Sequence, residues 1–484
     1  MHVEFLTGSS GSGKSKRLYD ILLDMSQENP DKKIFLVVPE QFTMQAQRNI
    51  VENSPGHGTF NIDIVSFNRL AYRIFEELGI ELPTAIDDTG KNLILRKIID
   101  ENKKAFKIIR AKDSQGFVSE IKSVISELLQ YSVTADMLKD ACGRLSTGGI
   151  NNNERLRRKL EDISLIYSAF KEYISDKYIT TEEVTAILCR YVDKSELLKN
   201  AVFAFDGFTG FTPVQYQLIE LLFDKADTMY FTLTLPQDGD RWLFDMSYDE
   251  LRRIGECADR HHVRVRRMNV GEAVPYRFKD SPQLAHLERN LYRDMAQYDG
   301  EADNITIYSA LGKKAEVAYV ASRIKSLVEN GLRYRQIGVI VSSMADYKEL
   351  LASIFEENKI PVFMDNKRSI LANPAVEYIR AALAIVEKDY SYESVFRLLK
   401  GYMCKNSGRF VDSVGSLDIF ENYVLALGIR GHKKYTEAFR RKYPSKRGMD
   451  LDVINDIRVK LLELMEPVYQ VFHDKDSTAA DYID

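Results

Sequence analysis

The sequence has 484 residues, of which 45% are hydrophobic and 29% charged, and its formal net charge is −4. This composition is typical of a globular protein with two or more domains, and the charge does not by itself indicate a nucleic-acid binder. A run of about 18 apolar residues and an N-terminal secretion signal are both missing, so we expect a cytoplasmic protein without a membrane partner. Its four scattered cysteines favour free thiols over a metal site or disulfides.

A phosphate-binding loop is predicted near the start of the chain, directly after the apolar run 3–6 and before a helical pattern. The residues Gly8, Ser9, Ser10, Gly11, Ser12, Gly13, Lys14 and Ser15 match G-x-x-x-x-G-K-[ST]. In such a loop, backbone N–H groups surround phosphate oxygens, the lysine reaches the β- and γ-phosphates, and the last hydroxyl holds Mg²⁺. The following helix directs its positive N-terminus at the phosphates. The sequence therefore predicts a site for ATP and Mg²⁺.

The first 300 residues are predicted to form one interrupted α/β domain. Short apolar runs that predict strands lie at 3–6, 34–38, 62–65, 202–205 and 229–235. Helical patterns follow the early runs, which favours βαβ units and a parallel sheet. Between 87 and 199 only helical patterns occur, so we expect an all-α insertion in a domain made of 1–86 and 200–300.

A second α/β domain is predicted over residues 301–372. Apolar or extended runs at 305–308, 337–341 and 360–363 alternate there with two helical patterns. From 373 to 484 the pattern is helical, and we expect the beginning of a second α insertion. The predicted fold class is therefore α/β, with two parallel-sheet domains that each carry an all-α insertion.

Asp206 is the candidate second ligand of the metal. It follows the apolar run 201–205, at the expected carboxyl end of a buried strand, where phosphate-loop NTPases hold Mg²⁺. An aspartate before Gly207 is by itself typical of a turn, but with the phosphate loop we expect it to share Mg²⁺ with Ser15. Active motors usually carry a glutamate after this aspartate to orient the attacking water. Gly207 cannot do so.

The order of these features resembles that of superfamily 1 helicases, with domains 1A (1–86 and 200–300), 1B (87–199), 2A (301–372) and 2B (from 373). Within that superfamily, the chain is identified as similar to the N-terminal part of AddB subunits of bacterial AddAB helicase–nucleases. The segments that carry the resemblance are Phe5-Leu6-Thr7-Gly8, VPEQFT at 38–43, VSFNRLA at 65–71, DGFTGFTP at 206–213 and Asp346-Tyr347-Lys348.

The resemblance implies a role in double-strand-break repair by homologous recombination. In such complexes AddA translocates with ATP, while AddB contacts DNA and carries a C-terminal nuclease with an iron–sulfur cluster. The implied partners are DNA, as a single strand and a duplex end, and AddA in a heterodimer. Because we find neither a D…E-x-K nuclease pattern nor closely spaced cysteines, we expect the nuclease and the cluster beyond residue 484, and we assign no catalytic residue.

The resemblance also places DNA contacts in the loops after the early strands. The candidate residues are Gln41, Thr43, Phe67, Asn68 and Arg69. They combine hydrogen-bonding groups, a cation and an aromatic face, as single-strand binders do. Alternatively, Phe67 is a core residue at a helix start and Ser66 is its N-cap. Basic clusters at 155–159, 260–267 and 433–447 are either solvated faces or phosphate contacts.

The chain also differs from related helicases that hydrolyse ATP in the stretch after the run 337–341. Many related helicases supply an arginine to the γ-phosphate in this stretch, whereas this chain has Ser342 and Ser343. We therefore expect a nucleotide site that binds ATP but turns it over weakly or not at all. Two alternatives stay open: a self-sufficient superfamily 1 helicase, which would need the missing carboxylate and arginine, and an unrelated phosphate-loop enzyme such as a kinase, which would need no DNA-facing motifs.

Overall fold

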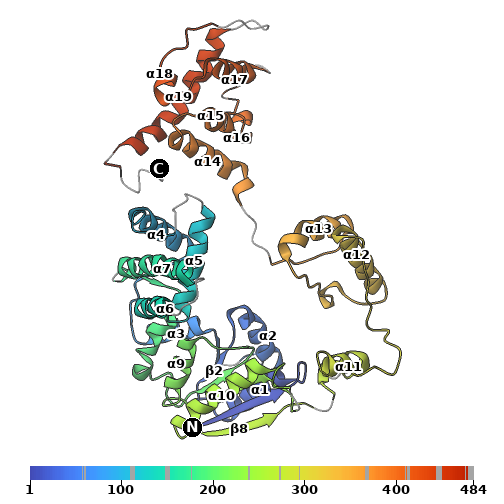
Figure 1. Ribbon diagram of the computed structural model, residues 1–484. Helices are drawn as coiled ribbons and strands as arrows, with labels where there is room; N and C mark the ends of the chain where they lie inside the picture. The colour runs from blue at the N-terminus through green and yellow to red at the C-terminus, as the bar shows by residue number, and fades with distance from the viewer. Residues whose placement is uncertain are drawn as a thin grey trace. The chain divides into compact units, whose positions relative to one another are not determined.

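The computed structural model of the chain forms two compact units, Met1–Tyr308 and Ser309–Asp484 (Figure 1). The residues that it describes are 1–56, 58, 61–108, 115–147, 153–175, 177–237, 240–271, 274–293, 295–365, 370–408, 410, 415–442, 450–474 and 476–477. Within this part of the chain, no helix is both long and apolar enough to cross a membrane.

The first unit is built on a six-stranded sheet in the order β3-β2-β6-β7-β1-β8, in which every pair of neighbours is parallel. Its strands are β1 (His2–Gly8), β2 (Ile34–Val37), β3 (Ile62–Val65), β6 (Val202–Phe205), β7 (Thr228–Thr234) and β8 (Arg264–Asn269). The five runs predicted as strands in the first 300 residues are confirmed. β8 was not predicted, because its alternating arginines look like a basic surface cluster, but an edge strand needs no buried face.

Helices cover both faces of this sheet. They are α1 (Lys14–Glu28), α2 (Thr43–Asn53), α3 (Phe67–Glu77), α9 (Pro213–Leu222) and α10 (Asp245–Arg260), with the short helix η1 (Glu40–Phe42) before α2. β2 shows how the sheet is divided: Ile34 and Leu36 belong to the apolar cluster under α1 and α2, whereas Phe35 and Val37 belong to the cluster under α3, α9 and α10. Such strands are apolar throughout because both of their faces are buried.

The insertion between β3 and β6 has its own apolar core, to which Leu95, Ile125 and Phe170 belong. Its elements are β4 (Thr84–Ile86), α4 (Asp88–Glu101), α5 (Gln115–Gln130), α6 (Ala135–Thr147), α7 (Asn153–Ile174), β5 (Tyr178–Thr180), α8 (Val184–Cys189) and η2 (Val192–Lys194). The expectation that 87–199 is purely helical is corrected by the parallel pair β4–β5. Three-residue strands are too short to show a period in the sequence.

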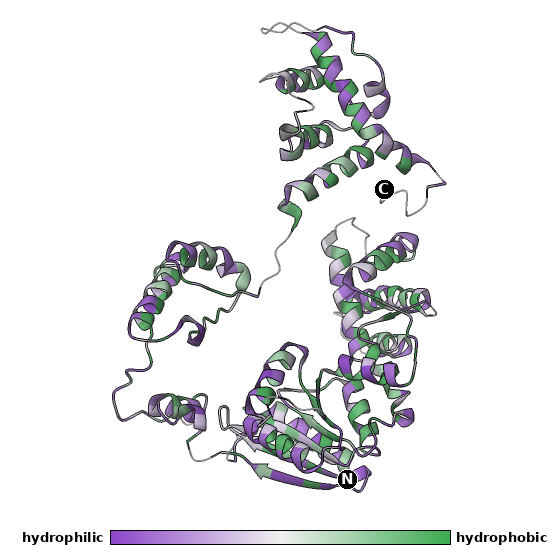
Figure 2. Ribbon diagram, turned by 180° about the vertical axis from the view of Figure 1, so that it is seen from behind, coloured by the Kyte–Doolittle hydropathy of each residue, from purple (hydrophilic) through white to green (hydrophobic). Residues whose placement is uncertain are grey.

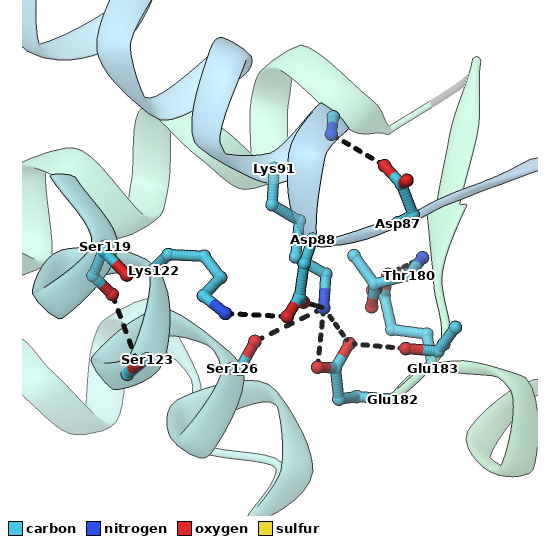
Figure 3. A network of polar contacts seen from close by, with 12 residues as sticks. Asp87, Asp88, Lys91, Ser119, Lys122, Ser123, Ser126, Thr180, Glu182 and Glu183 are labelled. Atoms are coloured by element: carbon cyan, nitrogen blue, oxygen red, sulfur yellow. Dashed lines mark hydrogen bonds and ion pairs between the residues drawn. The ribbon is translucent and has the colours of Figure 1, made fainter. Parts of the chain in front are cut away.

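A buried ion pair holds the insertion together where α4, α5 and the segment after β5 meet (Figure 3). Lys91 is only 1% exposed, and its Nζ lies 2.7 and 2.9 Å from the two carboxylate oxygens of Glu182 and 3.3 Å from Ser126 Oγ. Lys122 donates to Asp88 at 2.7 Å beside it. The hydrogen bond from Lys91 lowers the pKa of Glu182 although burial opposes it. Both buried charges are thereby compensated.

After β8, the first unit ends with η3 (Tyr276–Phe278) and α11 (Pro282–Asn290). The second unit contains α12 (Lys313–Glu329), η4 (Tyr334–Gln336), α13 (Met344–Glu357), η5 (Ile370–Ala372), α14 (Pro374–Glu387), α15 (Tyr392–Leu399), α16 (Tyr402–Asn406), α17 (Ser416–Leu427), α18 (His432–Thr436) and α19 (Leu451–His473). One apolar cluster joins α12 to α13, and another joins α14, α15, α17 and α19. Green apolar and purple polar residues alternate along these helices, as amphipathic helices require (Figure 2).

The strands expected in the second unit are not formed. Within the described residues the last strand ends at Asn269, and the runs 305–308, 337–341 and 360–363 have no sheet pairing. Ile340 is 99% exposed and Phe363 90% exposed. These runs have strand-like composition, but a strand needs a neighbour for its backbone hydrogen bonds. The α/β class therefore rests on the first unit.

Candidate nucleotide and DNA site

The loop between β1 and α1 has a backbone that requires glycine. Gly11 and Gly13 have φ angles of +77° and +95°, in the left-handed region that side chains rarely adopt. At Gly8 a Cβ atom would lie 2.2 Å from the carbonyl oxygen of Val270. The glycines of the motif are therefore needed for the loop's shape, which is the shape that directs N–H groups to phosphate.

Lys14 begins α1 and folds over the loop. Its Nζ donates to the carbonyl oxygens of Gly8 at 3.1 Å and Ser9 at 2.8 Å. Burial lowers the pKa of Lys14 to about 8; the charges of Asp206 and Glu288 oppose this shift, and that of Arg277 adds to it. At neutral pH the ammonium group is still mostly charged, as phosphate binding requires.

Asp206 lies buried at the carboxyl end of β6, and three hydroxyl groups bind its carboxylate. Ser15 Oγ donates to Oδ1 at 2.9 Å, Thr232 Oγ1 donates to Oδ1 at 2.6 Å, and the Tyr19 hydroxyl donates to Oδ2 at 2.8 Å. These bonds offset the cost of burying the charge. The structure thus brings Ser15 and Asp206 together, although 191 residues separate them in the sequence.

Tyr19 and Thr232 were missed by the sequence analysis. Tyr19 stands one helical turn after Ser15 on the same face of α1, and Thr232 follows Phe231, the residue paired with Phe205. Spacing from known site residues could have found both. Burial and the neighbouring Asp206 raise the pKa of Tyr19, so its hydroxyl keeps its proton and remains a donor.

Gly207 and Ser342, at the two positions where active helicases carry hydrolytic groups, supply neither a carboxylate nor a cation. Gly207 has a φ angle of +79°, which also fits the turn that follows β6, and it is exposed. Ser343 precedes α13 as its N-cap residue, with Ser342 just before it in the second unit. The weakly hydrolysing site stays a prediction.

Phe67 does not present a stacking face, and the expectation that it binds a base is corrected. It is 6% exposed, and its ring centroid lies 6.1 Å from that of Phe205, 5.5 Å from that of Phe208 and 6.1 Å from that of Phe211. Ser66 caps α3 by accepting a hydrogen bond from the Arg69 backbone N–H at 3.3 Å. The core alternative is the one that the structure forms.

The other DNA candidates differ in accessibility. Thr43 is buried and donates to the Glu40 carbonyl oxygen at 3.0 Å, so its hydroxyl is used within the fold. Gln41 and Arg69 are exposed and Asn68 is half-buried. Arg69 Nε lies 3.5 Å from Glu40 Oε1.

An aromatic side chain that the sequence analysis did not select lies beside these residues. Phe42, in η1, is 41% exposed and approaches Gly207 closely enough that a Cβ there would be 3.7 Å from its ring. Gln41 and Phe42 follow β2, Asn68 and Arg69 follow β3, and Asp206 follows β6, so all lie at the carboxyl edge of three adjacent parallel strands. This edge is where ligands bind in open α/β sheets.

Comparison with known proteins agrees with this architecture. The family model "ADDB, N-terminal" matches residues 5–288, and "UvrD-like helicase C-terminal domain" matches residues 279–442. Proteins named as subunits of an ATP-dependent helicase/deoxyribonuclease are similar over nearly the whole chain. That of Lachnoclostridium phytofermentans is 36% identical over 100% of this chain and 42% of its own length, and that of Clostridium kluyveri is 33% identical over 98% and 42%.

The Clostridium novyi protein of the same name is 34% identical over 96% of this chain and 40% of its own length. The chain thus spans about two fifths of the length of these relatives. The family match covers the phosphate loop, β6 with Asp206, and the edge that carries Gln41 and Arg69. The chain belongs to the AddB family, of which it contains the N-terminal region.

Proposed function

We propose that this chain is the nucleotide-binding and DNA-binding part of a cytoplasmic helicase–nuclease subunit that processes double-strand breaks for recombinational repair, with AddA as its partner in a heterodimer. The observation that carries the proposal is the convergence of Lys14, Ser15 and Asp206 at the same sheet edge as exposed polar residues after β2 and β3. The name of the relatives, which describes part of a helicase/deoxyribonuclease, supports the wider assignment.

The nucleotide proposed for this site is ATP with Mg²⁺, held by residues 8–15. The Ser15 hydroxyl and the Asp206 carboxylate, 2.9 Å apart, are hard oxygen donors of the kind that Mg²⁺ prefers. Bound there, the metal would neutralise phosphate charge. Lys14 binds the β- and γ-phosphates and the loop N–H groups orient them. Gly207 has no side chain to orient water, so binding without efficient turnover follows.

The proposed DNA ligand is a single strand that leads from a duplex end. Gln41 and Asn68 supply hydrogen bonds, Arg69 supplies a cation, and Phe42 replaces Phe67 as the stacking face. The proposal assigns nuclease chemistry and an iron–sulfur cluster to none of these residues. Among the described residues, no group of three or more His, Cys, Asp or Glu side chains has the arrangement of a metal site.

The test of the nucleotide site uses equilibrium binding and steady-state turnover of ATP. Lys14→Ala should abolish binding, whereas Arg17→Ala, an exposed cation on the same helix, should leave it unchanged. Turnover in the wild-type chain should be negligible beside that of an active motor. Lys14-dependent hydrolysis at a motor's rate would contradict the weakly hydrolysing site and favour a self-sufficient helicase.

The test of the DNA surface compares single-strand affinity at fixed salt concentration. Arg69→Ala and Gln41→Ala should each weaken binding, because they remove groups from the proposed path of the strand. Arg48→Ala is the matched control, since this arginine is exposed on α2 and paired with Glu52. Equal effects of Arg69→Ala and Arg48→Ala would show that only non-specific charge attracts the DNA.

A further inference from the structure

Residues 206–213 connect β6 to α9, and both ends of this connection are fixed. Asp206, at one end, belongs to the nucleotide site. Thr212, at the other end, caps α9: its Oγ1 accepts a hydrogen bond from the Gln215 N–H at 3.4 Å, and the Thr212 N–H donates to Gln215 Oε1 at 2.9 Å. We call residues 207–211, which lie between these ends, the aromatic segment. Its path depends on the groups that hold it between the two ends.

The aromatic segment supports the start of α3. The Phe67 ring centroid lies 5.5 Å from that of Phe208 and 6.1 Å from that of Phe211, and the centroids of Phe208 and Phe211 are 4.9 Å apart. Phe67 is the first residue of α3, and Asn68 and Arg69, two of the proposed DNA contacts, follow it directly. Closely packed side chains transmit a displacement to their neighbours. A shift of the aromatic segment would therefore move Asn68 and Arg69.

The backbone of Phe211 is held by Glu250, which reaches the aromatic segment from α10. The Phe211 N–H donates to Glu250 Oε1 at 3.2 Å, and the Tyr216 hydroxyl group donates to the same oxygen. Glu250 is only 6% exposed, and a Cβ atom at Gly210 would lie 3.4 Å from its Oε1. The carboxylate is thus enclosed by α10, by α9 and by the aromatic segment.

The environment of Glu250 is unfavourable for a carboxylate. Its second oxygen, Oε2, is buried and has no hydrogen-bond partner in the part of the chain that the structure describes. Burial raises the pKa of Glu250, and the hydrogen bonds from Tyr216 and Phe211 oppose this rise without cancelling it. Burying a carboxylate whose bonds are incomplete costs stability. The bond to Phe211 is therefore better explained by the position that it gives to the backbone.

We propose that Glu250 is a positioning residue for the DNA surface: its hydrogen bond to the Phe211 N–H holds the aromatic segment against Phe67, and this fixes the start of α3 for a single strand. The inference rests on the proposed DNA surface and adds to it a buried residue that the strand itself does not touch. Side chains that bind a ligand need such support, because a loosely held side chain loses the geometry of its contacts.

The effect of Glu250 should be confined to DNA binding. Asp206 is fixed by its own hydrogen bonds with Ser15, Thr232 and Tyr19, and none of these residues belongs to the aromatic segment. Loosening the aromatic segment at its far end should therefore leave the nucleotide site in place. This selectivity distinguishes a positioning role from a general loss of structure, which would weaken the binding of both ligands.

The test measures equilibrium affinities of the full chain for a labelled deoxythymidine oligonucleotide and for Mg-ATP, at fixed salt concentration and well below the melting temperature of each variant. Glu250→Ala should weaken oligonucleotide binding by at least about fivefold and ATP binding by no more than about twofold, because the Phe211 N–H loses its acceptor. Glu250→Gln keeps an acceptor oxygen and should stay within about twofold of the wild type for both ligands. Glu256→Ala removes an exposed glutamate of the same helix, paired with Arg252, and should change neither affinity.

Tyr216→Phe tests the same contact with a milder change. It removes the second donor to Glu250 Oε1, so the carboxylate is less firmly directed at the aromatic segment. Oligonucleotide binding should weaken by about two- to threefold, while the phenyl ring keeps its place in α9. This variant decides the question if Glu250→Ala does not fold.

Unchanged oligonucleotide affinity in a folded Glu250→Ala chain would overturn the inference, as would unchanged affinity in Tyr216→Phe where Glu250→Ala does not fold. Equal losses of ATP and oligonucleotide affinity, or a loss in Glu250→Gln as large as that in Glu250→Ala, would also overturn it. In each of these cases the DNA surface stands if Arg69→Ala weakens binding. If Arg69→Ala has no effect, the DNA surface and the inference both fail.

Discussion

Two regions of the molecule contain runs of similar apolar sequence and use them differently. In the first unit, β2 and β6 are buried along their full lengths between two layers of helices. In the second unit, the runs 337–341 and 360–363 have comparable composition, yet Ile340 and Phe363 are almost wholly exposed. Apolar residues dominate in both regions, but the second also has Gly338 and Pro361, which strands disfavour, and it lacks neighbouring strands. An apolar run gives a segment the capacity to be a strand, and adjacent strands supply its hydrogen bonds.

The two runs of the second unit are nevertheless partly packed against α12 and α13. Residues of both runs, together with α12 and α13, line a cavity of about 780 Å³. Ile337 and Val341 pack against the α12–α13 cluster, whereas Ile340 points away from it. Val339, between them, is 42% exposed, so the run is packed only in part. Burial, rather than composition, should decide what each side chain contributes to stability.

The largest expected effect tests this contrast directly. Phe203→Ala in β6 should lower the free energy of unfolding by about 4 kcal/mol, because it leaves a cavity in the fully packed sheet. Ile340→Ala should change it by less than about 0.5 kcal/mol, because exposed side chains lose little on truncation. Urea unfolding of both variants measures the difference. A comparable loss of unfolding free energy in Ile340→Ala would mean that this run is packed in solution, and it would contradict the contrast between the two regions.

The insertion offers the same contrast between a buried and an exposed position, here for two lysines. Lys91→Ala should cost about 3 kcal/mol, because it leaves the Glu182 carboxylate buried without its cation. Lys122→Ala removes the neighbouring lysine, whose partner Asp88 is largely exposed, and should cost less than about 1 kcal/mol. The same urea titration compares the two variants. If Lys122→Ala were the more damaging, the network of Figure 3 would be held by its exposed pair instead.

Two phenylalanines sharpen the comparison at the proposed DNA surface. Phe42→Ala should weaken single-strand binding by about 2 kcal/mol through lost stacking and leave the melting temperature nearly unchanged. Phe67→Ala should instead lower stability, because its ring packs among Phe205, Phe208 and Phe211. A binding titration beside a thermal melt separates the effects. Normal DNA affinity in a folded Phe42→Ala chain would remove the stacking role from this residue.

The smallest effect concerns the pH dependence of nucleotide affinity. Burial holds the pKa of Lys14 at about 8, below its ordinary value, so the unliganded site loses its positive charge as the pH rises through that value. Affinity for ATP should therefore be nearly constant from about pH 7 to 8 and then fall by up to about tenfold per pH unit. Lys14→Arg, which stays charged, should give a flat profile. A flat wild-type profile would show that Lys14 is not desolvated in solution.

The sequence predicted the parts of the site that depend on fixed spacing. The phosphate loop and the meeting of Ser15 with Asp206 follow because the carboxyl ends of parallel strands share one edge. The burial of Phe67 could not be predicted in this way, since it depends on aromatic residues about 140 positions later. β8 escaped prediction because an edge strand made of arginines lacks the apolar pattern. Local sequence patterns predict helices and strands, whereas the burial of a side chain depends on residues that are far away in the sequence.

The position of β1 in the sheet also bears on how the protein is made. This strand precedes both of its partners in the chain by more than 200 residues: β7 begins at Thr228 and β8 at Arg264. At translation rates of about 5–20 residues per second, the apolar segment His2–Gly8 waits for roughly 10–45 s before its first neighbour exists. During that time β2 and β3 can already pair with each other. The nucleotide site, which needs Thr232 of β7 beside Asp206, is therefore completed only late in the synthesis of the first unit.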